Sequence, residues 1–485
     1  MELDATTCER ARLSRDARFD GRFFVGVKTT GIYCRPVCPV RAPKAVNTTF
    51  YPTAAAAAEA GFRPCLRCRP ETAPGTPAWS GTSTTVSRAL RLIAEGALDE
   101  GSVDALADRL GVGSRHLSRL FMKHLGASPV GVAQTRRLHN AKKLIDETNL
   151  PMVQLALSAG YQSTRRFNTH IKETYGCAPS ALRKEASSKG QTEDGYRFRL
   201  HFRPPYDWHG VLGFLSRHAT PGIELVDDTG YSRTIDVNGT VGVFTVNLVP
   251  KEFCLQCTIR TSDSKNLIQI IERIKRLFDL SADSAEISSC LQRDSDLEPL
   301  VTANPGIRIP GGWDGYETAV RTIIGQQVSV AGANTTAGRM VRTYGSTLDA
   351  NGPLDRLFPS AEVLSRLQTT ELGMPTARAL TIKELSGAVC RGDVSFSDAN
   401  DPDMLYRQLT GIKGIGPWTA GYVAMRALGD PDVFPRSDLV LLKMAERLFC
   451  RGGRLTERDL LQRAQNWRPW RAYAAMYLWQ MASDG

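Results

Sequence analysis

The hydrophobic positions of this 485-residue chain change their period along its length. Between residues 196 and 260, apolar and polar residues alternate in short runs such as YRFRLHF, GIELVDD, YSRTIDV, VGVFTVNL and FCLQCTI, which predicts β-strands. Helical spacing predicts helices at about 207–218 and 264–278, and from about residue 305 it continues through most of the chain. The pattern therefore predicts an α+β lobe followed by an all-α region.

Two polar stretches interrupt this pattern. Residues 71–84 are rich in Pro, Gly, Ser and Thr, and residues 185–195 lack large apolar side chains. Neither composition can bury much apolar surface, so both stretches are predicted to be linkers. They divide the chain, which is too long for a single core, into a cysteine module, a helical module and a long C-terminal part. We expect the parts on either side of the second linker to fold independently.

The helical module contains an internal repeat. Residues 105–121, ALADRLGVGSRHLSRLF, and residues 155–171, LALSAGYQSTRRFNTHI, each read as a short helix, a turn and a second helix, with Gly111 and Gly160 in the turns. Residues 130–148 have helical periodicity and would join the two copies rigidly. The repeat predicts two helix-turn-helix motifs, and the alternative is a plain helical bundle.

The second helix of each copy is rich in polar and basic side chains. We expect Ser114 and Ser163 to cap the starts of these helices. In a helix-turn-helix, exposed side chains of the second helix face the major groove of DNA. The candidates are Arg115, His116, Arg119, Arg165, Arg166 and Asn168. The stretch 85–184 resembles the AraC-type DNA-binding domain, which implies an all-α double helix-turn-helix.

The distribution of charge supports a polyanionic partner. Residues 1–190 contain 28 Lys and Arg against 16 Asp and Glu, whereas the remaining residues contain 33 against 34. The whole basic excess of the chain therefore lies in its first 190 residues. Such a distribution favours a nucleic acid as partner, and the alternative is a basic surface that serves only solubility.

Four cysteines of the first module have the spacing of a metal site. Cys34 and Cys38 form one pair, and Cys65 and Cys68 form a second pair after a gap of 26 residues. Paired cysteines of this kind commonly hold zinc in a tetrahedron, so the spacing predicts one Zn²⁺ ion. A purely structural zinc site is the alternative to a reactive one.

The sequence around these cysteines carries a specific resemblance. The runs TTGIYCRPVC and AGFRPCLRC, followed by a helical module of this kind, resemble the N-terminal half of the Ada family over about residues 5–184. The resemblance implies an α+β zinc module at residues 1–75, in which the zinc-bound thiolate of Cys34 irreversibly accepts a methyl group from a DNA methylphosphotriester. It also implies a transcriptional regulator that this methylation activates. Nearby arginines are expected to hold the neighbouring phosphates, namely Arg35, Arg41, Arg63 and Arg67.

A glycine-rich turn and a carboxylate mark the C-terminal part. In LTGIKGIGPWTAGYVAMRAL (409–428) a helix ends, glycines permit a tight hairpin, and a helix restarts at Trp418. The backbone N–H groups of such a turn, here at Gly414 and Gly416, bind phosphate without regard to base sequence. Further along, in DVFPRSDLVLLK, Asp438 opens an apolar helix, where its simplest role is that of an N-cap.

These features belong to a longer ordered set. Together with PPYDWHGVLGFL, RTIIGQQVSV and WRPWRAYAAMYLW, they resemble the AlkA-type 3-methyladenine glycosylases of the helix-hairpin-helix superfamily over about residues 196–482. The resemblance implies an N-terminal α+β lobe at 196–300 and an all-α helix-hairpin-helix glycosylase domain at 301–485.

The same resemblance implies roles for single residues. Asp438 would be the catalytic carboxylate, and Gln327 would fill the gap left by the flipped base. The base pocket would be lined by Trp418, Tyr422 and Trp479. Because the catalytic lysine of the lyase branch is missing near Trp418, we expect a monofunctional glycosylase that leaves an abasic site.

The sequence also bears on location and partners. The N-terminal run has no apolar core of a signal peptide, and no segment offers about 18 consecutive apolar residues to span a membrane. Most of the eleven cysteines are scattered, which fits a reducing compartment, and the lone CxxC pair Cys254 and Cys257 falls inside a predicted strand and is interpreted as core. We expect a cytoplasmic, nucleoid-associated monomer without a membrane partner.

Taken together, the sequence predicts a multidomain alkylation-damage response protein that joins a methyl sensor, a transcription factor and a base-excision enzyme. Its expected partners are double-stranded DNA, both damaged and promoter, and RNA polymerase. Two alternatives remain open. One is a methylation-activated regulator whose glycosylase-like domain is inactive, and the other is a glycosylase with a structural zinc site and no methyl transfer.

Overall fold

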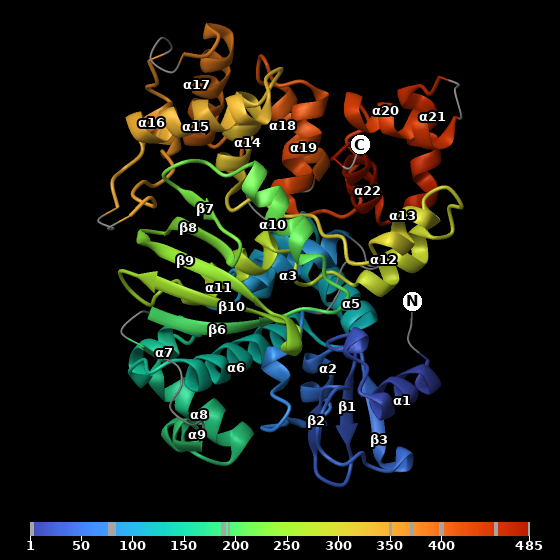
Figure 1. The fold of residues 1–485 in the computed structure, drawn as a ribbon. Coiled ribbons are helices and arrows are strands. Elements are labelled where there is room, and N and C mark those ends of the chain that lie inside the picture. The colour runs from blue at the N-terminus through green and yellow to red at the C-terminus, as the bar shows by residue number, and fades with distance from the viewer. Residues whose placement is uncertain are drawn as a thin grey trace. The chain divides into compact units, whose positions relative to one another are not determined.

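The computed structural model describes most of the chain (Figure 1). The described ranges are 4–75, 84–185, 191–192, 195–348, 352–368, 373–396, 402–450 and 454–483. The two predicted linkers lie largely outside these ranges, at 76–83 and at 186–190 and 193–194. Thr72 and Pro74, at the start of the first predicted linker, are buried.

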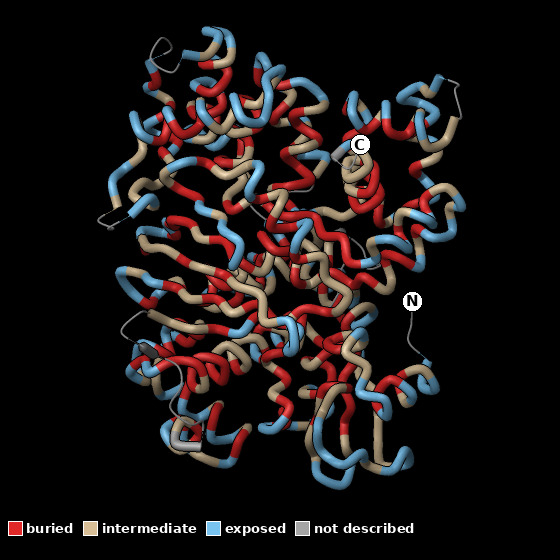
Figure 2. Tube along the Cα trace, in the orientation of Figure 1, coloured by how far each residue is buried: buried red, intermediate tan, exposed pale blue. Residues whose placement is uncertain are grey.

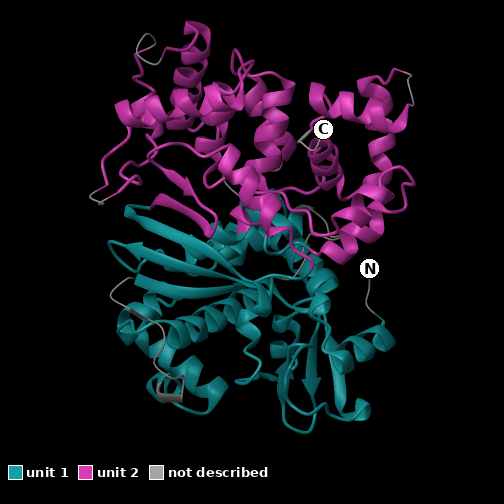
Figure 3. Ribbon diagram, in the orientation of Figure 1, with its two compact units in different colours: residues 1–204, 237–275, 280–282 teal, residues 205–236, 276–279, 283–485 magenta. Residues whose placement is uncertain are grey.

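The residues group into two compact units, coloured separately in Figure 3. One consists of residues 1–204, 237–275 and 280–282, and the other of residues 205–236, 276–279 and 283–485.

The first unit begins with a small α/β module. Its elements are α1 (Ala5–Ser14), η1 (Ala17–Phe19), β1 (Phe24–Val27), β2 (Ile32–Cys34), η2 (Ala45–Asn47), β3 (Thr48–Tyr51), α2 (Ala54–Glu59), β4 (Arg63–Pro64) and η3 (Pro70–Thr72). The strands form a sheet in the order β3-β1-β2-β4, in which β1 is antiparallel to β2 and β3 while β2 runs parallel to β4. Phe24, Tyr33 and Ala57 form a core between this sheet and α2. The alanine-rich α2 allows the helix to lie close to the strands.

Seven helices follow in the described residues of the same unit. They are α3 (Thr84–Ala94), α4 (Val103–Arg109), α5 (Ser114–Leu125), α6 (Pro129–Glu147), α7 (Met152–Ser158), α8 (Thr164–Tyr175) and α9 (Pro179–Glu185). The predicted helix–turn–helix pairs are confirmed as α4–α5 and α7–α8, and the connecting helix is confirmed as α6. Ser163 caps α8 by accepting a hydrogen bond from the Arg166 N–H. The expected cap at Ser114 is wrong, because Gly113 already takes the extended backbone that precedes α5 and Ser114 is its first helical residue.

The described part of the first unit is completed by the strands β5 (Gln191–Thr192), β6 (Gly195–His201), β9 (Thr240–Val249) and β10 (Cys254–Thr261). β10 pairs antiparallel with both β6 and β9, and β5 pairs with β6. Cys254 and Cys257 are buried in β10, which confirms their interpretation as core residues. Helix α11 (Leu267–Leu277) follows β10. The buried residues of these strands are red in Figure 2.

The second unit contains the hairpin β7 (Glu224–Val226) and β8 (Gly230–Val237) and most of the C-terminal helices. The helices are α10 (Trp208–Arg217), α12 (Ser284–Leu291), α13 (Glu298–Ala303), α14 (Gly315–Ile324), α15 (Val330–Tyr344), α16 (Ala361–Leu364), α17 (Thr376–Arg391), α18 (Pro402–Thr410), α19 (Pro417–Leu428), α20 (Leu439–Phe449), α21 (Glu457–Ala464) and α22 (Arg471–Ser483). Short 3₁₀ turns lie at η4 (Pro250–Glu252), in the first unit, and η5 (Gln465–Trp467).

Helices α14, α17, α18 and α19 share one apolar core, with Val320, Ile323, Leu385, Leu409 and Val423 among its fully buried residues. The ends of these helices are set by local chemistry. The Asp314 side chain caps α14 through the Glu317 N–H, and glycine in left-handed conformation ends α17 and α19.

Among the described residues, no helix combines the length and the apolar character that a membrane crossing requires.

Candidate functional site

The four predicted zinc ligands come together at the end of the small sheet. Cys34 ends β2 and Cys65 directly follows β4, and because these strands run parallel and in register, Cys34 and Cys65 emerge side by side. The sulfur atoms of Cys34, Cys38, Cys65 and Cys68 all lie within 4.8 Å of one another. A tetrahedral zinc ion with Zn–S bonds of about 2.3 Å separates its sulfurs by about 3.8 Å. The four cysteines are therefore arranged to bind one metal ion.

The pKa shifts of the clustered cysteines also indicate that a cation is needed between them. Hydrogen bonding with Cys38 raises the pKa of Cys34, and hydrogen bonding with Cys34 lowers the pKa of Cys38 to about 7. Thiols this close cannot all ionise without a compensating positive charge, because their thiolates repel one another. Zinc would supply that charge and hold all four as thiolates.

A backbone N–H group contacts one sulfur of the cluster: the Arg35 N–H donates to the Cys68 sulfur at 3.4 Å. Such a hydrogen bond stabilises a thiolate and reduces its tendency to react. Cys34 is less buried than Cys65 and Cys68.

Arg35 is not available to bind DNA, and this prediction is wrong. Its side chain is only 10% exposed, and its Nε donates to Asp20 Oδ1 at 2.9 Å while its Nη1 donates to Thr72 Oγ1 at 2.6 Å and to the Cys68 carbonyl at 3.1 Å. The guanidinium thus fixes the cysteine loop to its surroundings. The other three predicted phosphate contacts, Arg41, Arg63 and Arg67, are exposed.

The zinc module also contacts the connecting helix α6 within the first unit. Tyr33, next to Cys34, lies with its hydroxyl 2.8 Å from His139 Nε2, and Arg69, next to Cys68, forms ion pairs with Asp146 at 2.9 Å and Glu147 at 3.0 Å. Burial lowers the pKa of His139 to about 4, so this ring is neutral at pH 7. Residues adjacent to two of the metal ligands therefore rest on the helix that joins the two helix–turn–helix pairs.

The predicted major-groove side chains are exposed on α5 and α8. On α5 they are Arg115, His116 and Arg119, and on α8 they are Arg165, Arg166 and Asn168. Leu117 on α5 and Phe167 on α8 are fully buried, so each helix has an apolar inner face and a basic outer face.

In the second unit, Asp438 stands at the N-terminus of α20 and performs the N-cap role expected of it. Its Oδ1 accepts from the Leu441 N–H at 2.7 Å and from Trp479 Nε1 at 3.2 Å, while its Oδ2 accepts from Trp418 Nε1 at 2.5 Å. The carboxyl group is therefore a cap whose two oxygens are also held by two indole rings.

The aromatic residues beside Asp438 are arranged around Tyr422. Trp418 and Tyr422 lie one turn apart on α19 and stack on each other, with ring centres 5.4 Å apart and planes at 15°. Trp479 of α22 approaches Tyr422 edge-on, with ring centres 6.1 Å apart and planes at 67°. The structure thus brings together three aromatic residues and the carboxylate that the sequence resemblance selected.

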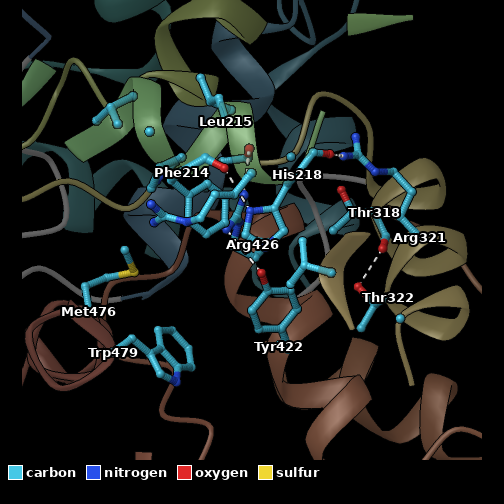
Figure 4. Close-up of a pocket in the computed structure, with 18 of the residues that line it drawn as sticks. Phe214, Leu215, His218, Thr318, Arg321, Thr322, Tyr422, Arg426, Met476 and Trp479 are labelled. Carbon is cyan, nitrogen blue, oxygen red and sulfur yellow. Dashed lines mark hydrogen bonds between the residues drawn. The ribbon is translucent and has the colours of Figure 1, made fainter. Parts of the chain in front are cut away.

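These four residues line a cavity of about 660 Å³, which is within the roughly 300–1,000 Å³ typical of ligand pockets. Figure 4 shows the part of its wall where Tyr422, Arg426, Phe214 and His218 meet. Sequence reasoning did not single out several lining residues, namely Phe214, His218, Trp313, Arg426 and Met476. A signal existed for one of them: Arg426 follows Tyr422 by four residues and Trp418 by eight, so all three share a face of α19.

The predicted hairpin lies between α18 and α19. Gly414 has φ +94°, and a Cβ atom there would lie 2.1 Å from Thr381 Oγ1, so the turn requires glycine. Gln326 Nε2 donates to the Gly414 carbonyl at 3.1 Å, which ties the hairpin to the segment between α14 and α15. The next residue, Gln327, is exposed and has φ +55°, and its neighbour Val328 lines the cavity.

Family models match three parts of the chain. The metal binding domain of Ada matches residues 7–71, a helix-turn-helix domain matches residues 106–185, and the AlkA N-terminal domain matches residues 197–314.

Three known proteins show how far these likenesses extend. The probable bifunctional transcriptional activator/DNA repair enzyme AlkA of Mycobacterium tuberculosis is 42% identical over 99% of this chain and 97% of its own length. DNA-3-methyladenine glycosylase 2 of Escherichia coli is 32% identical over 58% of this chain and 96% of its own length. The solved 3-methyladenine DNA glycosylase of Archaeoglobus fulgidus shares the fold of 58% of this chain and 96% of its own, with a TM-score of 0.50 at 20% identity. The similarity to the Mycobacterium tuberculosis protein covers the metal centre, the helical module and the aromatic cavity. The chain therefore belongs to the family of bifunctional transcriptional activator/DNA repair enzymes of the AlkA type.

Proposed function

We propose that the chain takes methyl groups from DNA methylphosphotriesters onto Cys34 and excises alkylated purines, of the 3-methyladenine type, as a monofunctional glycosylase. The observation that carries excision is the placement of Asp438, whose two oxygens are held by indole N–H groups at the wall of an aromatic cavity. The observation that carries methyl transfer is the cluster of four sulfurs within 4.8 Å of one another, in which Cys34 is less buried than Cys65 and Cys68.

Methyl transfer would be a direct displacement at carbon. The Cys34 sulfur attacks the methyl carbon, the C–O bond breaks, and the oxygen leaves with the electron pair as an ordinary phosphodiester. Zinc, when bound, keeps the sulfur as a thiolate at neutral pH. The product is a thioether that the chain has no means to reverse, so each molecule would act once. Arg41, Arg63 and Arg67 are exposed for contacts with neighbouring phosphates.

Methylation at Cys34 would also switch DNA binding. Converting one thiolate into a thioether removes one negative charge from a surface that faces phosphates. At about 6 Å and an effective dielectric near 20, one pair of unit charges interacts by roughly 3 kcal/mol before screening. We therefore expect methylated protein to bind a promoter duplex more tightly than unmethylated protein at low salt. If the two forms of the protein bound the promoter duplex equally well, methylation of Cys34 would repair the phosphotriester without regulating DNA binding.

In base excision, the negative charge of Asp438 would act on the sugar, and the aromatic side chains would contact the base. A flipped purine would lie against Tyr422 and Trp479, because Trp418 already covers one face of Tyr422. As the glycosidic bond breaks, the electron pair goes to the base and positive charge develops on the sugar, which Asp438 would stabilise. Water then adds to the anomeric carbon and gives up one proton to the solvent. The product is an abasic site. Gln327, exposed on its left-handed turn, would fill the gap in the duplex, and Gly414 and Gly416 would bind the backbone.

The organisation that supports this function has four parts: the zinc module at 1–75, the double helix-turn-helix at 85–184, the α+β lobe at 196–300 and the helix-hairpin-helix domain at 301–485. Exposed side chains of α5 and α8 support promoter recognition. We further propose that the chain acts as a monomer at the nucleoid in the cytoplasm and that RNA polymerase is its partner in activation.

Both activities can be tested on one preparation of the full-length protein with zinc. Mass spectrometry after incubation with methylphosphotriester-containing DNA should show a gain of one methyl group on Cys34. Release of free 3-methyladenine from alkylated duplex DNA should occur in the same preparation. Methyl transfer without base release would indicate a regulator with an inactive glycosylase fold, and release without transfer would indicate a structural zinc site.

A further inference from the structure

Arg426 is a buried cation in the wall of the cavity. It is 8% exposed, and its guanidinium lies over two rings, 4.3 Å from the centre of Phe214 and 5.6 Å from the centre of Tyr422 (Figure 4). Its hydrogen-bond partners are neutral and distant: the Tyr422 hydroxyl at 3.3 Å and the Gly311 carbonyl at 3.4 Å. Within the described ranges, its Nε has no hydrogen-bond partner.

Two acidic residues of the cavity lining, Glu224 and Glu317, are paired with other arginines. Glu224 pairs with Arg321 at 2.9 Å, and Glu317 pairs with Arg233 at 2.8 Å. Burial lowers the pKa of His218 to about 4, and its Nδ1 lies 2.8 Å from the Phe214 carbonyl, so this ring is neutral and brings no charge. A buried charge without a counter-ion is costly to a fold. Contact with two aromatic rings offsets part of that cost, and a ligand that accepts hydrogen bonds would offset more.

We propose that Arg426 determines which bases the cavity favours, by donating to an acceptor atom on the flipped base and stabilising the negative charge that a neutral base gains as it leaves. This inference rests on the proposed excision activity and deepens it. Tyr422 is the ring on which the base would lie, and Arg426 contacts both that ring and its hydroxyl. The guanidinium is therefore placed at the edge of the base rather than at the sugar.

The charge of the base decides how much it gains from Arg426. A neutral base leaves with the electron pair of the glycosidic bond and becomes an anion, so a nearby cation lowers its barrier. An alkylated base that is already cationic leaves as a neutral molecule and gains no such stabilisation, and the guanidinium repels it while it is bound. Arg426 thus acts against the preference for cations that the aromatic faces provide.

The test compares two substrates in matched duplexes, one with hypoxanthine as the neutral base and one with 7-methylguanine as the cationic base. Single-turnover excision rates are measured for the full-length protein and for Arg426→Met and Arg426→Lys. We expect Arg426→Met to lower the ratio of the hypoxanthine rate to the 7-methylguanine rate at least about tenfold, equivalent to about 1.4 kcal/mol. Arg426→Lys, which keeps the charge, should keep most of the ratio. If Arg426→Met does not fold by thermal melting, Arg426→Gln takes its place.

A control separates charge from structure. Arg463→Met removes an arginine that stacks on Phe449 outside the cavity lining. An unchanged ratio in Arg426→Met, an equal change in Arg426→Lys, or the same change in Arg463→Met would overturn the proposal. Failure of the unaltered protein to excise either base would instead overturn the proposed glycosylase function.

Discussion

At the scale of single residues, Asp438 combines two roles that favour different replacements. As an N-cap it needs an acceptor for the Leu441 N–H, which asparagine also supplies. As a catalytic group it needs negative charge, which asparagine lacks. Asp438→Asn should therefore remove most base excision, with little loss of DNA affinity in a binding assay on undamaged duplex. Because the asparagine NH₂ must face an indole N–H, we also expect a loss of about 1–3 kcal/mol in the free energy of unfolding.

Asp314→Asn is the matched control for this variant. Asp314 caps α14 in the same way but does not line the cavity. Excision of 3-methyladenine at the parental rate by Asp438→Asn would show that Asp438 is only a cap. An equal loss of excision in the two variants would show that capping alone explains the effect.

A second residue, Asp279, makes stability depend on pH. Burial raises its pKa to about 6, although Tyr473 donates to it at 2.7 Å and the Ile309 N–H at 3.1 Å. This value lies above the unfolded pKa of about 3.9, so the folded state binds more protons between about pH 4 and pH 6. The contribution of Asp279 to stability is thus present below pH 4 and is lost as pH rises to 6.

Asp279→Asn should remove this dependence. A shift of about two pKa units corresponds to about 3 kcal/mol, so the variant should gain up to that much stability relative to the unaltered protein between pH 4 and pH 7. Urea unfolding at several pH values measures the difference. A difference between the two proteins that stays constant over this range would contradict the buried-carboxyl explanation.

At the scale of elements, the hairpin between α18 and α19 depends on one glycine more than on its neighbour. Gly414→Ala would place a methyl group 2.1 Å from Thr381 Oγ1 at φ +94°, whereas a Cβ on Gly416 would meet nothing within 4 Å. We expect Gly414→Ala to lower the free energy of unfolding by about 1–3 kcal/mol and to weaken DNA binding. Gly416→Ala should leave stability nearly unchanged.

Thermal melting and binding to undamaged duplex DNA measure both effects. The hairpin contacts Gln326, which is next to Gln327, the residue predicted to fill the gap left by the flipped base. Distortion of the turn should therefore also slow base excision. Equal stability of the two alanine variants would show that the backbone relaxes around Gly414 at little cost.

At the scale of the whole molecule, the first compact unit contains residues from both sides of the predicted linker at 185–195. Lys143 of α6 donates to the Arg199 carbonyl of β6 at 2.9 Å and lies 5.7 Å from the centre of the Phe198 ring. The Ser158 hydroxyl donates to the Ser264 carbonyl at 2.8 Å, and Arg203 Nε donates to the Asp20 carbonyl at 2.8 Å. The helical and zinc modules thus hold contacts that a fragment ending at 184 would lose.

Fragments test this organisation. We predict that residues 1–184 still accept methyl groups and that residues 196–485 still excise bases. Fragment 1–184 should nevertheless unfold more readily than fragment 1–282, by about 1–3 kcal/mol, because in the shorter fragment Lys143 keeps Glu147 but loses the Arg199 carbonyl and the Phe198 ring. Urea unfolding, monitored by far-ultraviolet circular dichroism, measures this difference in the free energy of unfolding. Equal midpoints would show that the contacts with β6 contribute nothing to the first modules.

Much of the candidate site could be predicted from the sequence, because its signals are local. The spacing of Cys34 and Cys38 and of Cys65 and Cys68 limits each pair to one loop. The four-residue interval between Trp418 and Tyr422 places both rings on one face of a helix. The strands and helices of the α+β lobe followed from hydrophobic period in the same way. The cap at Ser114 was wrong by one residue, because a helix start depends on backbone angles that neighbouring residues share.

The sequence by itself determined which chemical groups the protein has and in what order: four thiolate ligands, two basic helices, an indole–phenol pair and a carboxylate. Only the tertiary structure decided what surrounds them. Arg35, a DNA contact in the sequence prediction, is a buried ion-pair partner of Asp20 in the structure. The Arg426 guanidinium lies over the ring of Phe214, which is more than two hundred residues away in the chain. These outcomes depend on packing between distant segments, and burial then sets which charges are free, paired or without a counter-ion.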